Sequence, residues 1–140
     1  MNASTQTVQM QAEQKRITLT SEIASQLPMI MADADKSSWV MINLLTNAIR
    51  YSGENSEVVV TVVRDNNNIR FSVQDEGIGI EEKYLSKIFD RYFKVPGNAG
   101  NGTGLGLAIS KEFIDAQGGQ FYVESKKGTG STFSFTLPVA

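Results

Sequence analysis

The chain has 140 residues, 41% of them apolar, and its 13 Lys and Arg side chains against 15 Asp and Glu give a formal net charge of −2. A chain of this length buries enough surface for one core without cross-links, so we expect a single globular domain. The sequence contains neither Cys nor His, which excludes disulfide scaffolds, thiolate and imidazole metal sites, and Ser-His-Asp catalysis. Any metal must bind through oxygen, and the weak, scattered positive charge argues against nucleic acid as a partner.

From the sequence we expect neither a signal peptide nor a membrane-spanning segment. No apolar run is long enough to cross a bilayer, and the stretch from Met1 to Gln14 lacks the basic start and apolar segment of a signal peptide. We therefore expect a cytoplasmic domain without direct membrane contact, which is compatible with a parent protein anchored in the inner membrane. Residues 1–12 are polar and are expected to be a flexible lead-in, with the domain itself spanning 13–140.

The first half of the domain predicts a strand, a long helix and a hairpin. Residues 17–20 have the character of a short strand. Residues 36–51, with Asp35 as the expected N-cap, form a helix that is apolar almost all round, which indicates burial on most sides. Two further runs, 58–64 and 69–74, flank a turn rich in Asn and Asp and predict an antiparallel hairpin.

The second half alternates helices with a second hairpin. Residues 81–89 predict a short helix, whereas 90–104 are rich in Gly, lack a hydrophobic period, and are expected to form a mobile loop. Helical spacing resumes over 105–117 and ends at two glycines. Two alternating strands, 121–125 and 132–137, close the chain. Helices between antiparallel strand pairs predict an α+β fold: a two-layer sandwich whose mixed, mostly antiparallel sheet carries helices on one face.

One narrow stripe of the otherwise apolar helix at 36–51 is polar. On a helix, Asn43, Asn47 and Arg50 fall in one narrow stripe, with Tyr51 at its edge. A single core Asn often bonds only to neighbouring backbone. Two amides one turn apart can instead bind a hard metal cation, and the Arg side chain that follows can bind the anion held by that metal, as in Mg²⁺ on a polyphosphate.

A second feature, Asp75-Glu76-Gly77-Ile78-Gly79, follows a predicted strand. The third Gly of a dinucleotide-binding fingerprint is missing, because Glu82 stands at that position. A plain glycine turn between a strand and a helix is the simpler interpretation of the two glycines. Asp75 adds a functional interpretation, because a carboxylate at the end of a core strand can accept a hydrogen bond from the exocyclic amine of adenine.

A third feature, Gly102-Thr103-Gly104-Leu105-Gly106-Leu107, lies where the expected loop meets a helix. It is no Walker loop, because no Gly-Lys-Ser/Thr follows. Glycines allow the backbone to approach a ligand closely, and free N–H groups at a helix start favour anions. Alone, such a turn is only weak support for phosphate binding.

The three features occur in an order that resembles the N, G1 and G2 boxes of the GHKL ATPase superfamily, which contains DNA gyrase, mismatch-repair ATPases and sensor histidine kinases. The resemblance is strongest to the catalytic, ATP-binding domain of two-component histidine kinases. Residues 42–52 resemble the N box, 88–93 the F box, and 128–133 with 137–138 the closing hairpin. The resemblance covers about residues 13–138 and implies ATP and Mg²⁺ as ligands.

At the phosphate end, the resemblance implies that Asn47 ligates Mg²⁺ and that Asn43 bonds near the γ-phosphate. Arg50 takes the position of the family's usual Lys, which keeps the charge. Arg91 either meets the γ-phosphate during transfer or forms a surface ion pair. Under a lid spanning about 92–103, the glycine-rich stretch is expected to line the phosphates through Gly102, Gly104, Leu105, Gly106 and Leu107.

At the adenine end, the resemblance implies that Tyr51 lies along the base and that Asp75 accepts its amine. Gly77 and Gly79 leave room for the base, and Thr132 is expected near it.

The resemblance further implies an ATP-dependent protein histidine kinase that relays phosphate to a response regulator. Where gyrase-type members have a Glu that activates water, this chain has Asn43, whose amide cannot take a proton. The family's acceptor is a His on a separate dimerisation domain. This chain has none, so it is expected not to phosphorylate itself. Two alternatives stay open, namely a GHKL serine kinase of the anti-sigma-factor type and a non-catalytic nucleotide-sensing domain.

Overall fold

The computed structural model describes residues 3–30, 33–94 and 106–140. In chain order the elements are helix α1 (Ala3–Gln14), strand β1 (Thr18–Ile23), helix α2 (Ala34–Tyr51), strands β2 (Glu57–Asp65) and β3 (Asn68–Asp75), the 3-10 helix η1 (Glu82–Tyr84), helix α3 (Gly106–Ala116), and strands β4 (Gln120–Lys126) and β5 (Gly130–Pro138).

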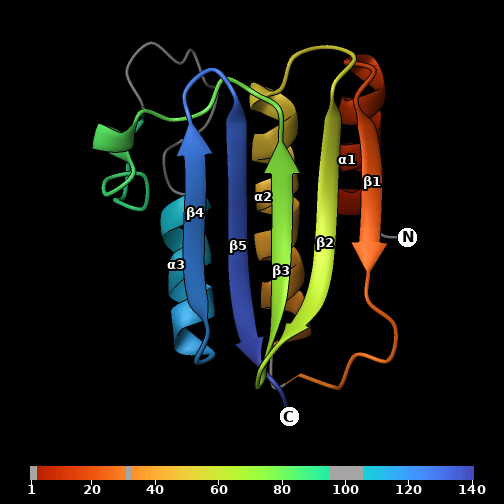
Figure 1. The fold of residues 1–140 in the computed structure, drawn as a ribbon, viewed down its shortest axis with the longest axis vertical. Helices are drawn as coiled ribbons and strands as arrows, with labels where there is room; N and C mark the ends of the chain where they lie inside the picture. The colour runs from red at the N-terminus through yellow and green to blue at the C-terminus, as the bar shows by residue number, and fades with distance from the viewer. Residues whose placement is uncertain (1–2, 31–32, 95–105) are drawn as a thin grey trace.

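The strands form one five-stranded sheet in the order β1-β2-β3-β5-β4. β1 runs parallel to β2, and every other neighbouring pair is antiparallel. Figure 1 shows helices α1, α2 and α3 behind the sheet, so that one face is covered and the other is open. The predicted two-layer α+β sandwich with a mixed, mostly antiparallel sheet is confirmed.

The core lies between the covered face of the sheet and α2. Because side chains alternate along a strand, one set of positions faces the helices. On β3 and β5 this set includes Phe71 and Phe135, whose rings stack with centroids 4.9 Å apart. The helix side is formed by fully buried residues of α2, including Val40 and Leu44. A helix that is apolar on most sides therefore lies centrally, as its pattern predicts.

The N-terminal segment differs from the prediction of a flexible lead-in. Residues 3–14 form α1, and the two apolar side chains Val8 and Ala12 are 3% and 2% exposed in the core. These residues lie one turn apart on an otherwise polar helix. An apolar stripe of only two side chains does not predict that the helix packs on the core, unless the surface against which it packs is known. The packed unit therefore includes α1.

Helix α1 ends in a Schellman motif. The Ile17 N–H donates to the Ala12 carbonyl at 2.8 Å, and the Arg16 N–H donates to the Glu13 carbonyl at 3.1 Å. Arg16 has φ of +56°, the left-handed conformation that this motif requires, although Gly is its usual occupant. The packed Ile17 fixes the direction in which the chain leaves the helix.

Two predicted boundaries are corrected. The N-cap of α2 is Asp33 rather than Asp35, because the Asp33 carboxylate accepts from the Lys36 N–H at 3.0 Å. The predicted helix at 81–89 is reduced to η1, since bonds from Tyr84 and Leu85 reach back only three residues. So short a segment rarely sustains an α-helix on its own. Within the described residues, no helix is both long enough and apolar enough to span a bilayer.

Candidate functional site

Several of the predicted site residues gather at one end of the sheet. The carboxyl end of β3, the turn between β4 and β5, and the last turn of α2 all lie at the upper end in Figure 1. Hydrogen bonds join these three segments directly.

Asp75 is the last residue of β3 and is only 7% exposed. Its Oδ1 accepts the Gly77 N–H at 2.8 Å and the Ser131 N–H at 3.3 Å. Burial raises the pKa of this carboxyl above its ordinary value, against the lowering effect of the two backbone hydrogen bonds. The described residues donate no hydrogen bond to Oδ2, so this oxygen is an acceptor that a ligand can use.

The chain after Asp75 turns against the end of α2. The Ile78 N–H donates to the Tyr51 carbonyl at 3.4 Å. A Cβ on Gly77 would lie 2.5 Å from that carbonyl oxygen and 2.9 Å from Asp75 Oδ1. Only Gly fits between the helix end and the carboxylate. The structure thus brings together Tyr51, Asp75 and Gly77, three residues that the resemblance assigns to the adenine end of a nucleotide.

The same loop is tied to the β4–β5 hairpin. Gly79 has φ of +71°, and a side chain there would collide with the Lys126 carbonyl. The Ile80 N–H donates to Ser125 Oγ at 2.7 Å, and Ser125 Oγ lies 2.7 Å from Ser131 Oγ. The loop is therefore held on one side by α2 and on the other by the Ser125 hydroxyl, which bonds in turn to the Ser131 hydroxyl.

Thr132 does not join this cluster. In the β3–β5 register Ser131 stands opposite Asp75, and Thr132 stands opposite Gln74. Successive residues of a strand point to opposite faces, so Thr132 lies on the open face while Ser131 lies with Asp75 on the covered one. The register therefore places Ser131, rather than Thr132, beside Asp75, and contact of Thr132 with the base stays a prediction. Sequence reasoning missed Ser131 and Ser125, although an alternating hydroxyl next to the Gly130 turn was a usable signal.

Asn43 joins α2 to the start of α3. Its Nδ2 donates to Ser110 Oγ at 3.2 Å, and Ser110 Oγ donates in turn to the Gly106 carbonyl at 2.7 Å. A Cβ on Gly106 would lie 2.5 Å from Asn43 Oδ1. The close approach of the two helices therefore depends on Gly106, and it places the Asn43 amide beside the first turn of α3.

Asn47 and Arg50 lie one turn further along α2. Arg50 Nη1 donates to Asn47 Oδ1 at 3.3 Å, and Arg50 is exposed. The long bond and the exposed guanidinium leave the amide oxygen of Asn47 accessible on the helix surface. The predicted polar stripe is confirmed as a geometric feature of α2.

Arg91 is separated from these residues. It forms an ion pair with Glu112 of α3, with Nη2 and Oε1 2.6 Å apart and both side chains more than half exposed. This is the surface ion pair that the sequence left open as one alternative. Leu107 packs against the core at the start of α3. Gly102, Gly104, Leu105 and most of the predicted lid lie outside the described residues.

The residues present fit a nucleotide with a hard cation. Asp75 is 7% exposed, its Oδ2 has no donor among the described residues, and Gly77 allows the following loop to pack closely against the carboxylate and the end of α2. Asn47 offers an amide oxygen, the ligand type that Mg²⁺ accepts together with substrate phosphates and water. The described residues contain no cluster of three acidic side chains, so a cation here would rely on the ligand's own phosphates.

Comparisons with known proteins identify the family. The family model described as "Histidine kinase-, DNA gyrase B-, and HSP90-like ATPase" matches residues 32–140. Sensor histidine kinase WalK of Bacillus subtilis (strain 168) is 42% identical over 111 residues, which are 76% of this chain and 18% of WalK. Sensor histidine kinase ZraS of Escherichia coli (strain K12) is 37% identical over 139 residues, which are 99% of this chain and 29% of ZraS. The chain thus spans less than a third of either relative.

Solved structures agree with this assignment. The catalytic domain of histidine kinase ThkA superposes with a TM-score of 0.84 at 30% identity, over 97% of this chain and 88% of that domain. Full-length ShkA, solved in complex with AMPPNP, gives a TM-score of 0.83 at 29% identity, over 98% of this chain and 30% of ShkA. The chain therefore belongs to the histidine kinase-, DNA gyrase B- and HSP90-like ATPase family, as an ATPase domain of the sensor histidine kinase type.

Proposed function

We propose that this domain binds Mg·ATP and presents the γ-phosphate to a histidine on a separate dimerisation domain, from which the phosphoryl group passes to a response regulator. The observation that carries the proposal is the placement of Asp75, with one unused carboxylate oxygen, directly beside the end of the helix that bears Asn43 and Asn47. A base acceptor and a polyphosphate-binding stripe thus lie within one site.

The adenine end is built from Asp75, Gly77 and Tyr51. Asp75 Oδ1 is held by two backbone N–H groups, so the carboxylate cannot rotate freely, and Oδ2 would accept the exocyclic amine. Guanine has a carbonyl oxygen in place of that amine, and two acceptors would then face each other. Unpaired buried polar groups of this kind discriminate strongly between ligands.

The phosphate end is built from Asn43, Asn47 and Arg50. Asn47 would hold Mg²⁺, which neutralises phosphate charge and orients the transferred group when bound. Arg50 supplies a fixed positive charge one turn away. Arg91 can reach a phosphate only by leaving Glu112, and its exposed ion pair is weak enough to allow this.

Asn43 favours transfer over hydrolysis. Its amide has no proton-accepting group at neutral pH and is already engaged with Ser110, so it cannot serve as a general base toward water. The chain's own residues therefore bind and orient, and the nucleophile must come from elsewhere. The names of the relatives, sensor histidine kinases, support a histidine as that nucleophile over a serine.

Titration calorimetry tests the proposal. ATP with Mg²⁺ is expected to bind, and GTP to bind at least about 100-fold more weakly. Asn47→Ala is expected to weaken binding in Mg²⁺ far more than binding in EDTA. Asn67→Ala, an exposed Asn in the β2–β3 turn at the opposite end of the sheet, is the matched control and should change neither. Equal affinities for ATP and GTP, or an unchanged Mg²⁺ dependence in Asn47→Ala, would contradict these assignments.

A further inference from the structure

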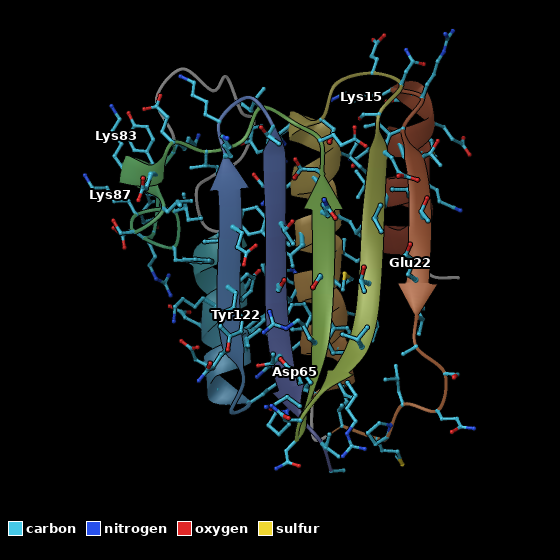
Figure 2. All side chains as sticks on the ribbon, viewed as in Figure 1. Lys15, Glu22, Asp65, Lys83, Lys87 and Tyr122 are labelled. Atoms are coloured by element: carbon cyan, nitrogen blue, oxygen red, sulfur yellow. The ribbon has the colours of Figure 1, made fainter. Side chains whose placement is uncertain are left out.

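Lys15 reaches from the end of α1 to the end of α2. Its Nζ donates to the carbonyls of Ile49, Arg50 and Ser52, at 2.8, 3.1 and 2.6 Å. An ammonium carries three N–H donors, so each of them is used on a backbone carbonyl. Figure 2 shows Lys15 at the upper end of the molecule, the end to which β3 and α2 deliver the candidate site.

The Schellman motif explains why Lys15 can do this. Lys15 is the C-cap of α1, and the bonds of Arg16 and Ile17 to the preceding turn fix its backbone. The Lys15 carbonyl also accepts the Asn55 N–H at 3.1 Å, which ties it to the loop after α2. The side chain is half-buried and starts from a rigid position, so little conformational freedom is lost in holding it.

Every carbonyl in the last turn of α2 has a donor. Ala48 accepts from the Ser52 N–H and hydroxyl, and Ile49 and Arg50 accept from Lys15. The Tyr51 carbonyl bonds to neither Ser52 nor Lys15, and it accepts instead from the Ile78 N–H beside Gly77. Lys15 holds the peptide groups on either side of Tyr51, and so it sets the direction of the carbonyl that supports the Asp75–Gly79 loop.

We propose that Lys15 is a positioning residue for the nucleotide site: its ammonium holds the last turn of α2 so that the Tyr51 carbonyl supports the loop beside Asp75. The inference rests on the proposed function for the ligand, and it goes beyond that function because Lys15 precedes residues 32–140, the part that the family model matches. It also connects α1 to the nucleotide site through one side chain. A shift of α1 relative to α2 would therefore alter nucleotide affinity.

Lys15→Met tests the inference, because Met keeps the apolar stem and removes the donors. Lys87→Met is the matched control: Lys87 is exposed, and its side chain has no partner among the described residues. By calorimetry, below the melting temperature of each variant, Lys15→Met is expected to bind ADP and ATP about tenfold more weakly, the scale of one lost charge-assisted hydrogen bond. Both nucleotides should lose the same factor, since the change lies at the adenine end. Lys15→Arg, which keeps charge and donors, should recover most of the affinity.

Amide hydrogen exchange gives a second readout that needs no nucleotide. The Ile78 amide should lose protection in Lys15→Met, while the Phe71 amide in the central strand β3 should keep it. Equal loss at both amides, or nucleotide affinity equal to that of Lys87→Met, would reduce Lys15 to a purely structural role and overturn the inference. If Lys15→Met does not fold, Lys15→Gln carries the same comparison. Absence of ATP binding in both the wild type and Lys87→Met would instead refute the proposed function, and the exchange experiment would still decide the role of Lys15.

Discussion

Gly77→Ala is the substitution for which the structure predicts the clearest loss. The added Cβ would lie 2.5 Å from the Tyr51 carbonyl oxygen, 2.9 Å from the Tyr51 carbonyl carbon and 2.9 Å from Asp75 Oδ1. Two of these three atoms belong to the backbone of α2, which cannot move without disturbing the core. The loop must shift away from the helix, and Asp75 must move with it or lose its bond from the Gly77 N–H.

The expected cost follows from the contacts that must change. Overpacking of this kind costs about 1–3 kcal/mol, and weakening a hydrogen bond to a carboxylate adds to it. The lower backbone entropy of Ala in the unfolded chain offsets about 0.4–1 kcal/mol. We expect a net destabilisation of about 2 kcal/mol, which lowers the melting temperature of a domain of this size by roughly 6–8 °C.

Gly53→Ala is the control, because Gly53 is exposed and a Cβ there meets nothing within 4 Å. Its stability should change by less than about 1 kcal/mol, in the favourable direction. Urea unfolding of both variants measures the difference, and ATP titration should show at least about tenfold weaker binding for Gly77→Ala alone. If the two variants unfold at the same urea concentration, the close approach between Tyr51 and Gly77 is wrong.

Three further predictions concern Asp75, Arg91 and Arg16. Burial raises the pKa of Asp75, so the folded protein keeps the carboxyl proton of Asp75 to a higher pH than the unfolded chain does. Ionisation of Asp75 therefore lowers the free energy of unfolding as the pH rises from the ordinary Asp pKa through the folded-state pKa. Asp75→Asn should remove this cost, so the variant should be at least as stable as the wild type in urea at pH 7 but impaired in ATP binding. If the stability of the variant relative to the wild type is lower at pH 7 than at pH 4, this reasoning is wrong. Arg91→Ala and Glu112→Ala both break one exposed ion pair, so each should cost less than about 1 kcal/mol in unfolding experiments. Only Arg91→Ala should slow phosphoryl transfer, and equal rates in the two variants would leave Arg91 an ion-pair partner alone. Arg16→Gly should raise the melting temperature slightly, since it relieves the left-handed backbone at φ of +56°, and a decrease would show that the Arg16 side chain contributes more than the strain costs.

Long periodic segments were predictable from the sequence. The helix at 34–51 and the two hairpins have strong patterns, and their physical signal is local, so the fold class follows from them. Segment α1 was missed because only Val8 and Ala12 bury it, and so sparse a stripe becomes meaningful only against the surface of α2. The prediction of a helix at 81–89 was wrong for the opposite reason. The composition favours a helix, but so short a segment does not sustain one.

The site was predictable in its residue types and less so in its contacts. Asp75 and Gly77 were found because a carboxylate and a glycine directly after a strand have a local meaning. The choice between Ser131 and Thr132 depends on strand register, and a shift of one residue reverses the face. The bond from Asn43 to Ser110 joins residues 67 apart in the chain, and the bonds from Lys15 span 34 to 37 residues. No sequence spacing encodes such contacts, which only the packing of α1, α2 and α3 creates.

The most direct test of the central claim is transfer from γ-labelled ATP. The domain is incubated with Mg²⁺ and labelled ATP, alone and with a separate dimeric helical hairpin that carries the parent protein's histidine. The domain alone is expected to bind ATP and to acquire no label, because it has no His and Asn43 cannot activate water. With the hairpin, label should appear on the hairpin in an acid-labile, base-stable form, as phosphohistidine does. Acid-stable label on the isolated domain, or rapid phosphate release without the hairpin, would contradict the account and favour a serine kinase or a hydrolase.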